Sequence, residues 1–286
     1  MTDQASTLRV IRGGGKPVAQ TVSRRAISVS GGKGGVGKST IALNLAVAYA
    51  QQGMRTLMVD TDLGMADLNL LLGVAPEKSL LDALGGTPIE DVLISAHGIQ
   101  LLPALNGSYL LSTIGPSSQQ RVLAMVHSLA TKFDTLVVDV AAGIGQSQTV
   151  FAGATTDAIV VVNPEPLSMA DAYATLKVLS IEQGVRHAYI VANRVTSRSQ
   201  AQEVTTRLQA LVTRFLDLKV TPLPPIPSDP CVTDAAHVGI PLLAHTPDAP
   251  AARAIRQLTR SLAALSPPTP TSSWWRQPDS VEGDRR

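Results

Sequence analysis

Cysteine is nearly absent from this sequence, since Cys231 is the one cysteine among 286 residues. That scarcity excludes an intramolecular disulfide framework and any metal or iron–sulfur site that needs several thiolates from this chain. Aromatic residues make up only 3%, so the core must be built mostly from Ala, Val, Leu and Ile. The net charge of +2 is too small to indicate binding to nucleic acid or to an anionic membrane by itself.

Long apolar runs are also missing. No run approaches the length of a membrane span, and the polar N-terminus has no secretory signal. We therefore expect a cytoplasmic protein. The histidines show no metal-ligand spacing, which predicts structural or exposed roles for His97, His127, His187, His237 and His245.

What is present is a regular alternation of short β-branched apolar runs with segments of helical composition. Helices are expected at 39–52 and 167–182, among others. Strands are expected at 26–30, 55–60, 99–103, 134–139, 157–163, 187–192 and roughly 218–224. Several of these runs are almost wholly apolar, as in strands covered on both faces. The pattern predicts an α/β fold, a doubly wound, mostly parallel sheet with helices on both faces.

Composition divides the chain into three parts. Residues 26–266 carry the alternating pattern and are expected to form one domain. Residues 1–25 are polar and Gly-rich, which indicates a flexible segment. Residues 267–286 are rich in Pro and Ser and lack helical periodicity, so disorder is expected there.

A phosphate-binding loop follows the first expected strand. Gly32-x4-Gly37-Lys38-Ser39 matches G-x-x-x-x-G-K-[ST], between an apolar strand and a helix-forming run. Backbone N–H groups of such a loop converge on phosphate oxygens at the positive end of the new helix. Lys38 would reach the β- and γ-phosphates, Ser39 would ligate Mg²⁺, and Thr40 would bond the α-phosphate. The predicted cradle comprises Gly32, Lys33, Gly34, Gly35, Val36, Gly37, Lys38, Ser39 and Thr40.

Carboxylates end two of the expected strands. TLVVD ends at Asp139, and LMVDTD places Asp60 and Asp62 two residues apart. Each aspartate alone is compatible with an ordinary turn or helix cap. Three of them beside a phosphate loop favour Mg–nucleotide binding, and we assign the metal to Ser39, Asp60 and Asp139.

The base is expected to be adenine. The Asn-Lys-x-Asp motif that reads guanine does not follow a late strand here. IVANRV instead places Asn193 at the end of an apolar run, where its amide would read the adenine edge. A turn asparagine is the alternative.

The loop carries a second lysine, Lys33, and so resembles the deviant-Walker-A ATPases, the MinD/ParA family, whose hallmark is K-G-G-x-G-K-[ST]. The resemblance covers residues 26–266. It implies an ATP-driven face-to-face homodimer in which Lys33 crosses to the partner's phosphates, as an arginine finger would. It also implies that Asp62 positions the attacking water, that Asp60 supports it, and that Asp139 with Gly143 forms a second switch.

Within this family several stretches resemble the FlhG (FleN) group, which regulates flagellar number and placement. VDTDLGMADLNLLLG and NPEPLSMADAYATLK are two of them. A third lies outside the ATPase domain: DQASTLR resembles the motif by which that group binds and activates FlhF, a signal-recognition-particle-type GTPase. The implied contact residues are Asp3, Gln4, Ala5, Leu8 and Arg9.

Two departures from the family pattern stand out. Asp139 is followed by Val140-Ala141, where relatives have D-[TS]-[GP]-A-G, which puts the hydrolysis rate in question. Residues 252–265 carry an apolar stripe with arginines elsewhere, which favours a last core helix over the membrane-binding helix of relatives. Trp274 and Trp275 are weak support for membrane contact.

Three functions compete on these grounds. The first is a slow, Mg-dependent regulatory ATPase for flagellar number, with FlhF and a flagellar switch or transcription regulator as partners. The second is a ParA-type partitioning ATPase, which would need a basic DNA-binding face. The third is a MinD-type regulator of the division site. We expect the first, with no specific nucleic acid, and with reversible association with the inner membrane at the cell pole left open.

Overall fold

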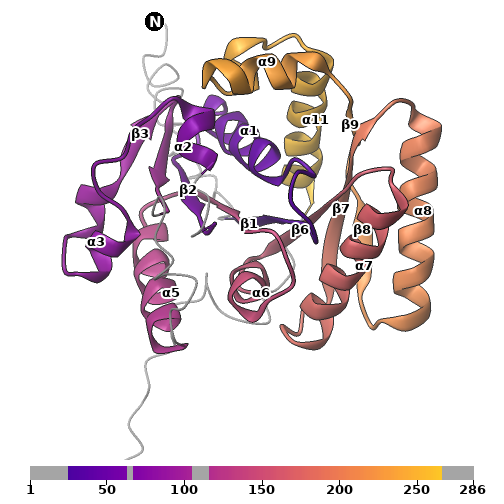
Figure 1. Ribbon diagram of the computed structural model, residues 1–286, viewed down its shortest axis with the longest axis horizontal. Helices are drawn as coiled ribbons and strands as arrows, with labels where there is room; N and C mark the ends of the chain where they lie inside the picture. Colours follow the sequence, from indigo (N-terminus) through magenta and orange to yellow (C-terminus); the bar gives the residue numbers. More distant parts are fainter. Residues whose placement is uncertain (1–24, 63–66, 105–115, 266–286) are drawn as a thin grey trace, which may run out of the picture.

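A mostly parallel sheet forms the centre of the protein, as the computed structural model shows for residues 25–62, 67–104 and 116–265 (Figure 1). Its strands are β1 (Arg25–Ser30), β2 (Thr56–Asp60), β3 (Ile94–Ala96), β4 (Ile99–Leu102), β5 (Thr135–Asp139), β6 (Asp157–Val162), β7 (His187–Val195), β8 (Lys219–Pro222) and β9 (Ile226–Pro227). The order across the sheet is β3-β4-β2-β5-β1-β6-β7-β8, with β9 also paired to β7. Among the strands that the structure describes, only β3 runs antiparallel, against β4. The predicted fold class is confirmed.

The helices alternate with these strands. They are α1 (Lys38–Gln51), α2 (Asp67–Leu72), α3 (Leu80–Leu84), η1 (Ile89–Val92), α5 (Pro116–Ala130), α6 (Gln146–Gly153), α7 (Pro166–Ile181), α8 (Arg198–Phe215), α9 (Pro230–Val238), α10 (Leu242–His245) and α11 (Pro250–Ala264). Figure 1 shows α1, α9 and α11 on one face of the sheet and α5, α6, α7 and α8 on the other. Each face therefore has its own apolar core.

Helix α1 is buried along most of its length. It packs between the sheet and α11, and residues from Ile41 to Tyr49 are all buried. A helix covered on nearly all sides needs no polar stripe, and its sequence is correspondingly apolar all round. This packing fixes the start of α1, and hence the loop before it, against the sheet.

The last helix belongs to the core. In α11 the side chains of Ile255, Leu258 and Leu262 are buried against the α1 face of the sheet. Most of the apolar stripe of residues 252–265 is thus used for packing, as expected, while Leu265 at its end is exposed. Among the described residues, no helix is both long enough and apolar enough to span a bilayer.

Strand β7 is longer than its sequence predicted. It continues through Asn193 to Val195 because Ile226 and Pro227 add a short parallel strand beside it. Asn193 is therefore a strand residue paired with Ile226, and the prediction that the strand ends at 192 was wrong. The apolar pattern stops at Ala192, but backbone pairing with a distant segment does not.

Candidate functional site

The loop between β1 and α1 approaches two other elements closely. A Cβ on Gly32 would lie 2.3 Å from the Asp171 carbonyl oxygen of α7. A Cβ on Gly37 would lie 2.4 Å from Asn193 Nδ2, and Gly37 has φ 98°. Only glycine fits both positions, because the neighbouring backbone and a buried amide leave no room and L-residues disfavour this φ.

The Asn193 side chain supports the loop between β1 and α1 through a hydrogen bond. Its Nδ2 donates a hydrogen bond of 2.8 Å to the Val36 carbonyl oxygen, and the side chain is buried. The amide therefore satisfies a buried backbone acceptor of the loop. Its predicted role in recognising adenine stays a prediction.

The two lysines of the loop have different surroundings. Lys38 is buried, and its Nζ donates to the Lys33 carbonyl oxygen at 3.4 Å. Burial lowers the pKa of Lys38, opposed by the negative charges of Asp139, Asp62 and Asp67. Lys33 instead extends to the residue before α7, where its Nζ lies 2.7 Å from Glu165 Oε2. Lys38 is thus placed for a phosphate of its own loop, while Lys33 is directed away from it.

Carboxylates gather at the same edge of the sheet. Asp60 and Asp139 are register partners on β2 and β5, and Asp139 pairs with Val29 next to the loop. Asp60 Oδ1 accepts a hydrogen bond of 2.9 Å from the Asp62 N–H. The structure therefore brings together the three aspartates that the sequence singled out.

Burial of these carboxylates is costly without a positive partner. Burial raises the pKa of Asp139 to about 7, against a hydrogen bond from Ser39 and the charge of Lys38. Burial and then the neighbouring Asp139 raise the pKa of Asp60 well above its usual range. Asp60 Oδ2 and Asp139 Oδ1 are buried and have no hydrogen-bond partner within the described part of the chain. Two such oxygens at the strand ends beside the loop suit a hydrated cation.

The donor set fits Mg²⁺ bound together with phosphates. Among the described residues, no group of three His, Cys, Asp or Glu side chains is placed to hold a metal by itself. Mg²⁺ commonly takes one or two carboxylates, waters and substrate phosphates rather than an all-protein cage. Ser39, Asp139 and Asp60 would supply the protein's share.

The second predicted switch follows β5. Gly143 has φ 113°, a backbone conformation that glycine adopts without strain. Val140 is buried in the core, and its N–H donates 3.0 Å to the Val29 carbonyl oxygen. The valine that departs from the family pattern is therefore a packing residue that extends the β5–β1 pairing.

Three residues near the loop were missed by the sequence analysis. Glu165 pairs with Lys33, Asp171 packs its backbone on Gly32, and Asn163 buries an Oδ1 that accepts no hydrogen bond from any residue the structure describes. All lie in or beside NPEPLSMADAYATLK, which was noted only as a likeness to FlhG. The available signal was the position of Asn163 and Glu165 directly after an apolar strand, where ligand-binding residues of such sheets lie.

Some predicted site residues lie outside the described part of the chain. These are the partner-binding residues Asp3, Gln4, Ala5, Leu8 and Arg9, and also Trp274 and Trp275.

A glycine-constrained loop at a helix N-terminus, a buried loop lysine and paired strand-end carboxylates define a P-loop nucleotide-binding protein. A family model for ParA, described as NUBPL iron-transfer P-loop NTPase, matches residues 22–263. The chain belongs to this family, the MinD/ParA ATPases.

Relatives and a solved structure agree with this assignment. The antiactivator FleN of Pseudomonas aeruginosa is 36% identical over 211 residues, which is 73% of this chain and 75% of FleN. The flagellum site-determining protein YlxH of Helicobacter pylori is 30% identical over 184 residues, 64% of this chain and 62% of YlxH. The structure of MinD from Pyrococcus horikoshii with Mg-ADP superposes with a TM-score of 0.70 at 29% identity, covering 84% and 96% of the chains.

Proposed function

We propose that this protein is an ATP-switched dimer that hydrolyses ATP slowly and controls the number and placement of flagella. The observation that carries the switch is the divergence of the two loop lysines, Lys38 buried at its own loop and Lys33 held outside it by α7. A lysine turned away from its own phosphate site can serve a second subunit once its pairing with Glu165 opens. FleN and YlxH among the relatives support the flagellar role.

The chemistry follows from the site. When bound, Mg²⁺ would neutralise charge on the β- and γ-phosphates. Ser39 and Asp139 would hold it, with Asp60 behind them. Lys38 of the same subunit would neutralise the phosphates, and Asp62 would orient the attacking water. Lys33 of the second subunit would supply charge to the transferring phosphoryl group, so that dimerisation completes the site.

The proposed partner is FlhF, bound through residues 3–9. A short amphipathic segment that orders on a partner is a common recognition mode. FleN is named an antiactivator, so we add a transcriptional activator or a flagellar switch component as a second partner. We do not propose iron transfer, since Cys231 is the one cysteine in the 286 residues.

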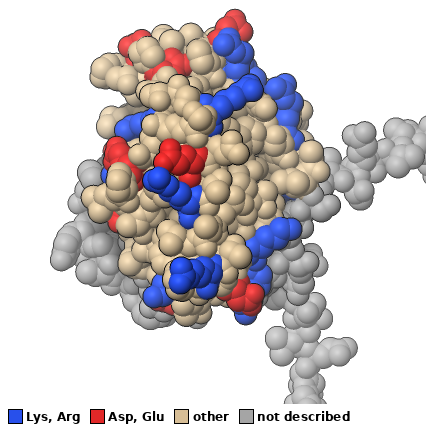
Figure 2. Space-filling view, turned by 90° about the vertical axis from the view of Figure 1, so that its right-hand side faces the viewer, with Lys and Arg blue, Asp and Glu red and all other residues tan. Residues whose placement is uncertain are grey.

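The two alternative functions receive less support. Figure 2 looks onto the side of the molecule that carries α8, and there Lys and Arg are dispersed among acidic and uncharged residues. Such a face lacks the continuous basic surface that sequence-independent DNA binding requires. The MinD-like fold is common to the whole family. It therefore does not favour a role in cell division over a role in flagellar control.

The test is FlhF binding and stimulation of its GTPase. The full-length protein should bind FlhF and raise its GTPase rate, and Gln4→Ala/Leu8→Ala should lose both effects. The matched control is Ser6→Ala/Thr7→Ala, which changes the two residues of DQASTLR that are not among the implied contact residues. Equal stimulation by all three proteins would reject residues 3–9, and no binding by any of them would reject FlhF as partner.

A further inference from the structure

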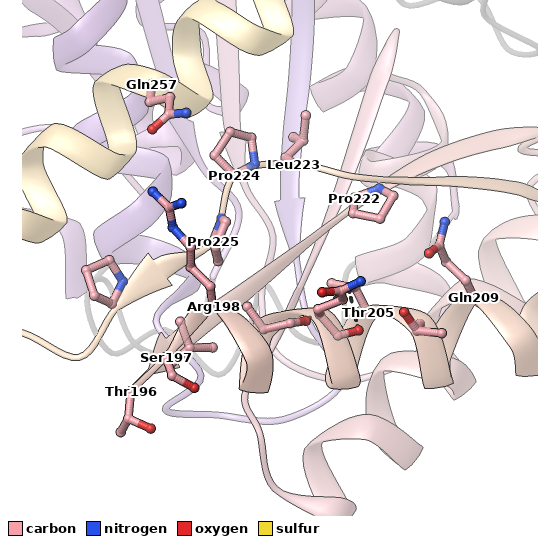
Figure 3. Close-up of a pocket in the computed structure, with 15 residues that line it drawn as sticks. Thr196, Ser197, Arg198, Thr205, Gln209, Pro222, Leu223, Pro224, Pro225 and Gln257 are labelled. Carbon is pink, nitrogen blue, oxygen red and sulfur yellow. Dashed lines mark hydrogen bonds between the residues drawn. The ribbon is translucent and has the colours of Figure 1, made fainter.

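A groove of about 880 Å³ lies at the edge of the sheet, away from the phosphate loop (Figure 3). One wall is a face of α8 that presents Thr205, Gln209 and their neighbours. The other wall is the segment Pro222–Pro227, which connects β8 to β9. Arg198 and Gln257 lie where these walls approach α11, as Figure 3 shows. The volume is within the range of natural ligand sites.

This edge of the sheet is closed to an added strand. Leu223 N–H donates to Ile190, so the alternate positions of the segment point outward, and two of these are prolines, Pro222 and Pro224. Proline has no N–H to offer to a new strand. The outward carbonyl of Val220 already accepts a bond of 3.0 Å from Gln209 Nε2. The groove therefore suits side chains better than a paired backbone.

Its lining has a distinct chemistry. Proline rings and Leu223 form one side, hydroxyl and amide side chains the other, and Arg198 is the one charged residue among those that line it. Proline-rich surfaces pair with aromatic rings in peptide recognition. Exposed amides such as Gln202 and Gln257 can accept the indole N–H that a buried tryptophan must satisfy. The lining therefore fits tryptophan better than an aliphatic or a strongly charged group.

We propose that this groove binds the chain's own segment 266–286 through Trp274 and Trp275. Both tryptophans of the chain lie in that segment. The described chain ends at Leu265, directly after α11, and Gln257 on that helix lines the groove. The segment carries three acids, Asp279, Glu282 and Asp284, against three arginines, Arg276, Arg285 and Arg286, so the contact is assigned to the tryptophans and not to charge.

Covalent geometry allows this contact. Gln257 lies about two turns before Leu265, about 12 Å along the helix axis. Trp274 follows Leu265 by a stretch that spans about 30 Å when extended. The segment is thus long enough to turn back along α11 to the groove, with length to spare.

Tryptophan fluorescence tests the proposal directly, because all of it comes from residues 274 and 275. The nucleotide-free full-length protein is compared with a synthetic peptide of residues 266–286. We expect the protein's emission at shorter wavelength and most of the acrylamide quenching lost. Emission and quenching equal to those of the free peptide would overturn the proposal.

Two groove variants locate the binding site. Thr206→Arg and Gln202→Arg place a large charge on exposed groove positions of α8, and each should restore emission and quenching to the peptide's values. Thr213→Arg is the matched control, exposed on the same helix but outside the groove, and should behave as wild type. Circular dichroism checks that each variant is folded. Wild-type protection in both groove variants would overturn the groove as the site.

A dilution series distinguishes the source of the tryptophans. Protection that is independent of protein concentration supports docking within one chain. Protection that is lost on dilution would assign the groove to the tail of a second copy and overturn the proposal as stated. The outcome does not depend on the ATPase or flagellar function, since no nucleotide or partner is present.

Discussion

Lys33 Nζ lies 2.7 Å from Glu165 Oε2, within one subunit, and the two residues are 132 positions apart in sequence. The pair joins the phosphate loop to the start of α7, directly after the residue Pro164. The Lys33 side chain is 29% exposed and that of Glu165 is 59% exposed, so water screens the attraction. If Lys33 serves a second subunit, this contact must open first, and the equilibrium between monomer and dimer includes its loss.

Glu165→Gln should therefore favour the ATP-bound dimer. An exposed ion pair contributes about 0.2–1 kcal/mol, and each of the two subunits loses one, so the concentration for half-dimerisation should fall by roughly 2- to 30-fold. Analytical ultracentrifugation with a non-hydrolysable ATP analogue measures this. Glu182→Gln, at the opposite end of α7, is the control and should leave dimerisation unchanged. A weaker dimer in Glu165→Gln would mean that Glu165 stabilises the dimer itself.

Asp62→Ala should separate dimerisation from hydrolysis. Asp62 lies beyond β2, and its N–H donates to Asp60, so the change removes a carboxylate at the loop without emptying the core. Loss of the group that orients water should reduce phosphate release by about 10²-fold or more, while the ATP-bound dimer persists. Asp234→Ala, an exposed aspartate of α9, is the control. Normal phosphate release from Asp62→Ala would remove Asp62 from the mechanism.

The buried carboxylate Asp139 should make stability depend on pH. Its pKa is about 7 in the folded protein against an ordinary 3.8, so between these values the folded state keeps a proton that the unfolded state releases. The free energy of unfolding contributed by Asp139 therefore falls as pH rises from about 4 to about 7. Asp139→Asn has no such titration. Its free energy of unfolding should therefore increase relative to that of wild type over this range, by as much as roughly 4 kcal/mol at about 1.4 kcal/mol per pH unit.

Urea unfolding from pH 4 to 8 without Mg²⁺ or nucleotide measures this difference. Asp91→Asn, at an exposed position of η1, is the control and should follow wild type. In the presence of Mg²⁺ and ATP, wild type should instead be more stable than Asp139→Asn, because the variant lacks the carboxylate that Mg²⁺ requires. A constant difference between wild type and Asp139→Asn across pH would show that Asp139 is ionised throughout.

Asn193→Ala distinguishes support of the loop from recognition of the base. The variant leaves the buried Val36 carbonyl oxygen without its partner, at a cost of about 1–3 kcal/mol. If the amide only supports the loop, affinities for ATP and GTP should fall by the same factor, as calorimetry would show. A change in the ratio of the two affinities would instead establish the predicted contact with adenine.

Residues near one another in sequence were the predictable part of this site. The loop, the strand-end positions of Asp60 and Asp139, and the helix that follows Gly37 all follow from local pattern, because a parallel sheet gathers the ends of its strands. Contacts between distant segments were not predictable in this way. Asn193 lies 157 residues from Val36, and its position depends on β9 lengthening β7.

The same limit applies to packing. Val140 looked like a change in a catalytic switch, but its side chain fills the core, which only the arrangement of β5 and its neighbours shows. The stripe of α11 was ambiguous for the opposite reason, since one amphipathic pattern serves both a core and a membrane surface. Only its burial against the sheet distinguishes the two.

The central claim is that Lys33 acts across an ATP-dependent dimer while Lys38 binds the nucleotide of its own subunit. Light scattering on size-exclusion chromatography, with a non-hydrolysable ATP analogue, tests it for wild type and Lys33→Ala, and a fluorescent ATP analogue measures binding in parallel. We predict a dimer for wild type, and for Lys33→Ala a monomer that still binds ATP. An unimpaired dimer of Lys33→Ala would contradict the account.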